Sequence, residues 1–131
     1  MARMVNRALP TDAELSILRV LWRRGPQTVR EVHDALGPVQ GTGYTTVLKL
    51  MQIMAQKGLV ARDEAQKSHV YSAVMPEEQA QHGLMRDLLD KAFEGSASQL
   101  VMAALSSERA SKTEIAEIRA LLDNLERKKT R

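Results

Sequence analysis

The chain has 131 residues, of which 44% are hydrophobic and 27% charged, a composition typical of one globular domain or of two small subdomains that share a core. It contains no cysteine, which excludes disulfide scaffolds, cysteine-ligated zinc fingers, iron–sulfur clusters and thiol catalysis. The formal net charge is +3, and no apolar run approaches the ~20 residues that span a bilayer. Because the N-terminus also has no apolar core of signal-peptide length, we expect a soluble cytoplasmic protein without membrane insertion.

Charge is divided unevenly along the chain. Residues 1–75 hold ten lysines and arginines against six acids, whereas residues 76–131 hold nine against ten. A basic first half beside a nearly neutral second half suggests that only the first half meets an anionic partner. Aromatic residues make up 3% of the chain, too few for stacking platforms that bind single-stranded nucleic acid.

Two short helices are predicted at the start of the chain, each opened by a capping box. Thr11 and Glu14 have this spacing in the first helix, and Thr28 and Glu31 have it in the second. A glycine–proline pair ends each helix, because proline cannot continue one. Their apolar faces are Leu15, Leu18, Leu21 and Trp22 in the first helix, and Val29, Val32, Ala35 and Leu36 in the second.

A third helix is predicted after a linker, residues 37–43, that contains three glycines and a proline. This helix begins near residues 42–44 and stops at Gly58, the residue type expected just after a helix. Two short extended runs follow, residues 59–62 and 69–74, and the polar stretch between them predicts a hairpin turn. The core stripe of the third helix is Val47, Leu50, Met51 and Met54.

The remainder of the chain is predicted to be helical. A fourth helix begins with Pro76 at its first position and runs to about Phe93. The short segment 98–105 is rich in small apolar residues, and Ser111 with Glu114 opens the last helix with a third capping box. The last helix has an apolar seam of the kind that packs between helices, made of Ile115, Ile118, Leu122 and Leu125.

Three helices followed by a hairpin form the winged variant of the helix-turn-helix. We therefore expect a mostly α fold with a small β-hairpin wing. Residues 1–75 are expected to form a winged helix-turn-helix DNA-binding domain, and residues 76–131 a helical dimerisation domain.

The third helix gives the strongest functional signal. The side opposite its core stripe presents Thr45, Lys49, Gln52 and Gln56, and no acid occurs between Tyr44 and Lys57. Lysine can donate to guanine and glutamine can pair with adenine in the major groove, although an ordinary solvated face is the alternative. We expect base or near-base contacts from Thr45, Thr46, Lys49 and Gln52, and backbone contacts from Tyr44, Arg62 and Lys67. Asp63 and Glu64 beside the hairpin tip oppose that use by repulsion.

No pattern indicates catalysis, a metal site or a cofactor. His33, His69 and His82 are scattered without ligand spacing, and we interpret each as a surface residue. No serine lies in a G-x-S-x-G setting, and Gly41-Thr42-Gly43 lacks the third glycine and preceding strand of a dinucleotide site. Two alternatives stay open. A small enzyme would need a pocket with perturbed acids or a metal. A winged-helix protein–protein adaptor without sequence-specific DNA binding should show no steep salt dependence when it is titrated with duplex DNA.

Segments spread over most of the chain match one known family in order. They are Tyr44-Thr45-Thr46-Val47, Leu50, residues 57–60, Arg62, residues 14–22, Val70-Tyr71, Leu100-Val101 and Glu114-Ile115. From about Leu9 to Lys128, the chain resembles the penicillinase-repressor (BlaI/MecI-type) family of bacterial winged-helix transcription regulators. The resemblance implies a homodimer that binds a palindromic operator of double-stranded DNA and blocks transcription of β-lactamase-type or related resistance or stress genes.

The resemblance also implies how repression is relieved. A membrane sensor protease leads to a cut in the short fifth helix, after which the dimer fails. The ungapped position of the cut is Ala103-Ala104 here, where well-studied members have Asn and Phe, so cleavage with another specificity and relief by another route both stay open. The chain lacks the C-terminal cysteine cluster of the copper-responsive branch, which excludes that metal-sensing mechanism. The expected dimer interface is Leu100, Val101, Ile115, Ile118, Leu122 and Leu125.

Overall fold

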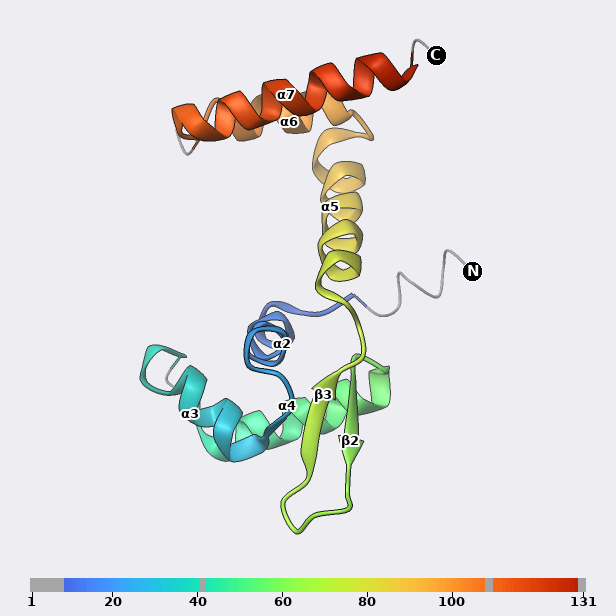
Figure 1. Ribbon diagram of the computed structural model, residues 1–131. Helices are drawn as coiled ribbons and strands as arrows, with labels where there is room; N and C mark the ends of the chain where they lie inside the picture. Colours follow the sequence, from blue (N-terminus) through green and yellow to red (C-terminus); the bar gives the residue numbers. More distant parts are fainter. Residues whose placement is uncertain (1–8, 41, 108–109, 130–131) are drawn as a thin grey trace. The chain divides into compact units, whose positions relative to one another are not determined.

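The computed structural model describes residues 9–40, 42–107 and 110–129. The chain forms two compact units that divide between Arg86 and Asp87. The described part of the first unit contains α2 (Asp12–Arg24), β1 (Gln27–Thr28), α3 (Val29–Gln40), α4 (Tyr44–Lys57), β2 (Val60–Asp63), β3 (Val70–Ala73) and the first part of α5 (Glu77–Phe93). The second unit contains the rest of α5, α6 (Ala97–Leu105) and α7 (Lys112–Lys129) (Figure 1).

The capping boxes form as predicted. In α2 the Thr11 hydroxyl accepts from the Glu14 amide at 3.2 Å, and the Glu14 carboxylate accepts from the Thr11 amide at 2.9 Å. The same reciprocal pair joins Thr28 and Glu31 at the start of α3. Each box satisfies two backbone N–H groups that have no partner within the helix.

The buried side of α2 differs from the predicted one. Leu18 and Leu21 are buried as expected, but Leu15 is only half-buried, and Glu14 and Ile17 complete the buried face. The buried face of α2 therefore begins with a carboxylate, and a search for periodic apolar residues does not detect it.

The glycine–proline pair at residues 37–38 interrupts α3. Gly37 has φ and ψ of 19° and −117°, which are not helical, so the range to Gln40 spans two helical stretches that meet at a kink. The predicted end at Gly37 coincides with this kink. Pro76 lies just before the first residue of α5 rather than at its predicted first position, and its carbonyl accepts from the Ala80 amide at 3.1 Å.

The sheet is antiparallel with the order β1-β3-β2. Strands β2 and β3 form the predicted hairpin, in which Arg62 pairs with Tyr71, and this wing extends beyond α4 in Figure 1. The two-residue β1 was not predicted, since a dipeptide is too short to show alternation. The mostly helical chain with its small antiparallel sheet confirms the expected fold class.

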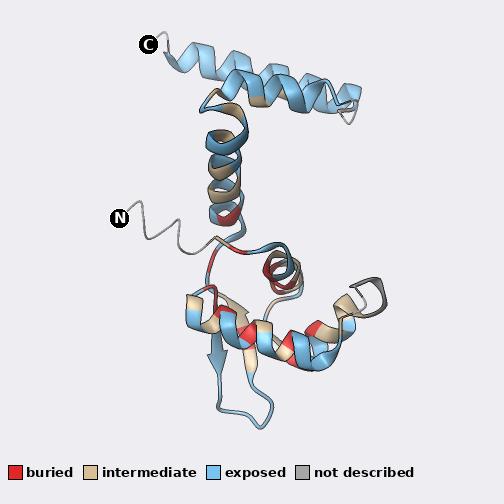
Figure 2. Cartoon of the chain, turned by 180° about the vertical axis from the view of Figure 1, so that it is seen from behind, coloured by how far each residue is buried: buried red, intermediate tan, exposed pale blue. Residues whose placement is uncertain are grey.

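The core lies within the first unit, as the red segments of Figure 2 show. Its largest fully buried side chains include Tyr71, Ile17, Leu18, Met51 and Met54. Half-buried Trp22 packs against this core and donates from Nε1 to the Met75 carbonyl at 2.9 Å. Ala80 on α5 is fully buried as well, so the start of this helix belongs to the first unit.

The second unit contains no buried residue in its described parts, 87–107 and 110–129. In the described residues, none of the helices has the length and apolar character needed to cross a bilayer.

Candidate nucleic-acid interface

Helix α4 presents a largely polar exposed face that also includes the aliphatic side chain of Ile53. Val47, Met51 and Met54 bury one side of the helix, and Leu48 and Leu50 pack against the same core. Since residues repeat every 100° around a helix, the side chains on the other side are left in solvent. The exposed side chains include Thr45, Thr46, Lys49, Gln52 and Gln56.

Glycine sets both ends of α4. Gly43 is the N-cap residue and forms no side-chain cap, so the first backbone N–H groups of the helix have no side-chain acceptor at the cap. Gly58 ends the helix in the left-handed conformation at φ 82°, which glycine adopts without a steric penalty.

A groove of about 640 Å³ separates α4 from the wing, with the start of α3 as its third wall. It brings together four of the residues predicted to contact DNA, namely Tyr44, Gln52, Arg62 and Lys67. Thr45, Thr46 and Lys49 do not line the groove; they are exposed elsewhere on α4. The predicted contact residues are therefore divided between the groove and the outer face of α4.

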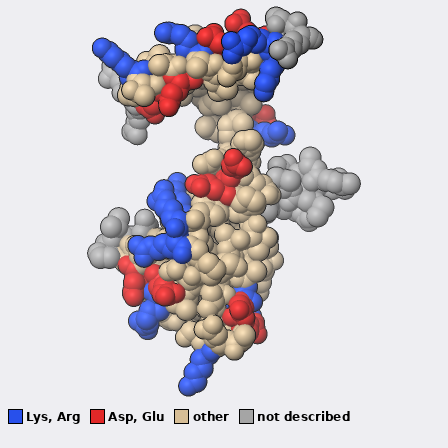
Figure 3. Space-filling model, in the orientation of Figure 1, with Lys and Arg blue, Asp and Glu red and all other residues tan. Residues whose placement is uncertain are grey.

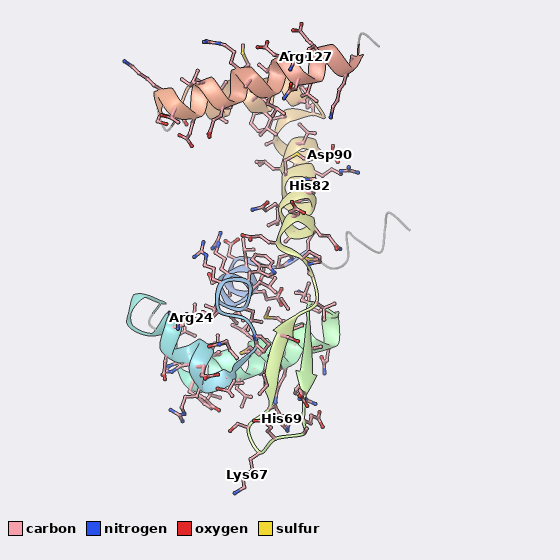
Figure 4. The ribbon with its side chains drawn as sticks, in the orientation of Figure 1. Arg24, Lys67, His69, His82, Asp90 and Arg127 are labelled. Atoms are coloured by element: carbon pink, nitrogen blue, oxygen red, sulfur yellow. The ribbon has the colours of Figure 1, made fainter. Side chains whose placement is uncertain are left out.

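The two predicted wing cations differ in their surroundings. Lys67 extends outward from the hairpin tip, as Figure 4 shows, and on the face drawn in Figure 3 basic side chains occur at that tip and beside α2 and α3. Arg62 instead pairs with Glu64, its Nε lying 2.8 Å and one of its terminal nitrogens 2.6 Å from the carboxylate. Hydrogen bonding to Tyr71 and then to Glu64 raises the pKa of Arg62 above its ordinary value. Its guanidinium is thus already engaged.

The acids of the wing are also engaged locally. Besides the pair that Glu64 forms with Arg62, the Asp63 carboxylate accepts from the Ala65 amide at 2.9 Å within the turn. The pairing of Glu64 with a cation reduces the repulsion of DNA phosphates that the sequence predicts for this hairpin.

Tyr44 packs between two side chains of α3. The guanidinium carbon of Arg30 lies 5.0 Å from the centre of the Tyr44 ring, and the His33 ring meets the same ring edge-on at 6.1 Å. Sequence reasoning passed over Arg30, although its three-residue spacing from His33 places both on one side of a helix. The Nδ1 atom of His33 is buried and lies 3.5 Å from a carboxylate oxygen of Asp34, while the side chain as a whole is 27% exposed, so this predicted surface histidine is half-buried.

The seam predicted for the dimer interface is accessible in the single chain. Ile118 and Leu100 are half-buried, whereas the other four residues of the expected dimer interface are exposed. Leu122 is the most exposed of these at 54%. The exposed members are Val101, Ile115, Leu122 and Leu125. The predicted cleavage residues, Ala103 and Ala104, are exposed within α6.

No group of three histidines and acids is placed to hold a metal ion in the part of the chain that the structure describes. Figure 4 shows how far apart some of these side chains lie, with His69 on the wing and His82 on α5.

Several known proteins are similar to this chain. The profile of the family described as penicillinase repressor matches residues 10–124. The transcriptional regulator BlaI of Mycobacterium tuberculosis is 36% identical over 92 residues, which cover 70% of this chain and 67% of BlaI. The methicillin resistance regulatory protein MecI of Staphylococcus aureus is 20% identical over 113 residues, which cover 86% of this chain and 92% of MecI.

The solved structure of a MarR family protein from Bacillus stearothermophilus matches 99% of this chain and 82% of its own, with a TM-score of 0.53 and 18% identity. At this identity the match shows a shared fold and nothing about the ligand.

Proposed function

The chain belongs to the penicillinase repressor family, and from this premise we propose that it represses transcription by binding operator DNA as a homodimer. Relatives such as BlaI and MecI are named as regulators, not as enzymes. The observation that supports DNA binding most strongly is the exposed face of α4, which has hydrogen-bonding side chains and no acid. Such a face suits a major groove lined by phosphates.

In this proposal, residues 1–75 bind DNA and residues 76–131 hold two copies together. Thr45, Thr46, Lys49 and Gln52 contact base edges, while Lys67 contacts the phosphate backbone. The dimer places two α4 helices in half-sites about one helical turn apart, ~34–36 Å. By similarity to MecI, whose name refers to methicillin resistance, the regulated genes include resistance genes, and the protein acts in the cytoplasm.

The second unit supports the dimer. Its described residues form helices with an apolar seam, yet none of them is buried within the single chain. A helix stripe of large aliphatic side chains is normally covered by a partner, since exposed apolar patches of this kind mark interfaces. The seam Ile115, Ile118, Leu122 and Leu125 is expected to pack against its copy, with Leu100 and Val101 adjoining it.

DNA binding is tested by titrating duplex DNA from upstream of the chain's own gene at several salt concentrations. Each neutralised phosphate contributes roughly −0.9 to the slope of log K against log salt. A slope shallower than about −2 leaves too few phosphate contacts for a dimeric DNA-binding protein and supports the adaptor instead. Lys49→Ala should lower specific affinity by about 1–3 kcal/mol if Lys49 contacts a base. Lys112→Ala on α7 removes the same charge and should leave that affinity unchanged.

The dimer is tested by sedimentation of Leu122→Asp at micromolar concentration. The substitution places a charge in the seam and should give monomers, with a sharp loss of operator affinity because the half-sites uncouple. Ala120→Asp introduces the same charge on an exposed position outside the seam and should leave the dimer intact. An intact Leu122→Asp dimer would place the interface elsewhere.

We propose that repression ends when α6 is cut or opened at Ala103-Ala104, with a membrane sensor protease as the relay. A cut there separates residues 1–103 from the seam, and each DNA-binding unit loses an effective-concentration gain of ~10²–10⁴ in affinity. The test exposes cells to a β-lactam and follows the chain by mass spectrometry. A fragment that ends near Ala103, found only with the drug and together with derepression, supports this route. Derepression with an intact chain refutes it.

A further inference from the structure

We propose that Arg30 contacts a DNA phosphate at the groove between α3, α4 and the wing, and that Tyr44 positions its guanidinium. This inference rests on the proposed DNA binding and reassigns Tyr44 from a direct contact to a positioning residue. The geometry that supports it is the placement of the Arg30 guanidinium carbon 5.0 Å from the centre of the Tyr44 ring, with both residues lining the groove.

The position of Arg30 in α3 is unfavourable for the helix itself. Arg30 is the second residue of α3, close to the N-terminal end, where the helix dipole favours acids and disfavours cations. The side chain is exposed, so packing does not require it there either. A cation kept at this end of a helix therefore points to an anionic partner outside the chain.

Two acids that line the groove with Arg30 interact with other groups. The Glu31 carboxylate accepts from the Thr28 amide at 2.8 Å, and an Asp34 oxygen lies 3.5 Å from His33 Nδ1. Among the described residues, Arg30 forms no ion pair within 4.0 Å. Its charge is thus not neutralised by a neighbouring carboxylate, in contrast to Arg62, which pairs with Glu64.

The Tyr44 ring contacts the Arg30 guanidinium without engaging the N–H donors of Arg30. An arginine stacked on an aromatic face keeps its in-plane N–H groups available, and these match the geometry of a phosphate. His33 meets the other part of the Tyr44 ring edge-on, so the ring itself is held from α3. Because the ring orients Arg30 before DNA arrives, less side-chain freedom is lost on binding.

The location agrees with a role in positioning the protein on the duplex. Arg30 and Lys67 line the same groove, Arg30 from the start of α3 and Lys67 from the wing, and α4 contributes a further wall. Backbone contacts on either side of a helix in the major groove fix its register without specifying sequence. The arginines on the outer side of α2, such as Arg19, line a separate hollow and serve as the comparison.

The experiment titrates random-sequence duplex DNA and the upstream duplex with the full chain and four variants. Arg30→Ala should weaken binding to both duplexes by at least about tenfold. It should also make the salt slope shallower by about 0.9 per protomer. Arg19→Ala removes an equal charge and should leave the slope unchanged. Fluorescence of Trp22, the single tryptophan, verifies that each variant is folded.

The Tyr44 variants separate positioning from direct contact. Tyr44→Ala should lose most of the affinity that Arg30→Ala loses, and Tyr44→Phe, which keeps the ring, should restore it. Equal losses in Tyr44→Phe and Tyr44→Ala would assign the contact to the hydroxyl and overturn the inference. An unchanged slope in Arg30→Ala, or an equal change in Arg19→Ala, would overturn it as well. Absence of salt-dependent binding by the unsubstituted chain would instead refute the proposed function.

Discussion

Substitution of Lys57 by methionine should destabilise the first unit more than substitution of its partner Glu14 by glutamine. Lys57 Nζ lies 2.7 and 3.0 Å from the two carboxylate oxygens of Glu14, and the pair joins the C-terminal end of α4 to the start of α2. The two side chains are not equally shielded, because Glu14 is 3% exposed and Lys57 is 30% exposed. The energetic cost of losing the partner therefore differs between them.

The expected magnitudes follow from this asymmetry. Lys57→Met leaves a buried carboxylate that keeps the hydrogen bond from the Thr11 amide but has lost its cation, so the loss should approach the ~3–5 kcal/mol typical of a broken buried pair. Glu14→Gln leaves an ammonium that can turn toward water, and the neutral amide can still accept from the Thr11 amide. We expect about 1–2 kcal/mol for this change, the cost of a weakened charged hydrogen bond.

Urea unfolding monitored by Trp22 fluorescence measures both changes, since this single tryptophan packs against the same core. The double variant should lose about 2 kcal/mol less of its free energy of unfolding than the sum of the single losses, because it contains no buried carboxylate without a cation. A loss below about 1 kcal/mol for Lys57→Met would show that the pair behaves as an exposed one and would refute this reasoning. Equal losses for Lys57→Met and Glu14→Gln would refute it as well.

Three further substitutions test local features of the first unit. Gly25→Ala should cost about 1–3 kcal/mol, because φ 83° with ψ −163° is a conformation that essentially only glycine adopts. Gly58→Ala should cost less, about 1–2 kcal/mol, since its left-handed conformation is also adopted by other residues. A Cβ would meet nothing within 4 Å at either glycine, so the difference tests the backbone conformation alone, and equal losses in urea unfolding would contradict this order. Trp22→Phe removes the hydrogen bond to the Met75 carbonyl and should cost about 1–3 kcal/mol by circular dichroism, whereas an unchanged midpoint would mean that water replaces the donor.

Local signals in the sequence were sufficient for the order of the helices and of the two hairpin strands, and for the outer face of α4. Capping pairs such as Thr11 with Glu14 act within three residues, and the core stripe of α4 repeats within one helix. Proline and glycine likewise mark the ends of segments close to them in sequence, and the alternation of side chains along a strand repeats every two residues. The exposure of Thr45, Thr46, Lys49 and Gln52 could therefore be predicted, while their contact with DNA stays a prediction.

Contacts between distant segments decided the rest. The Lys57–Glu14 pair joins residues 43 apart, and the Trp22 hydrogen bond joins residues 53 apart, so neither has a periodic signature. The same holds for Tyr44, which meets Arg30 only when α3 and α4 pack together. A side chain's type determines what it can bind, but burial and neighbours from other elements determine which charges remain available, and only the tertiary structure brings those neighbours together.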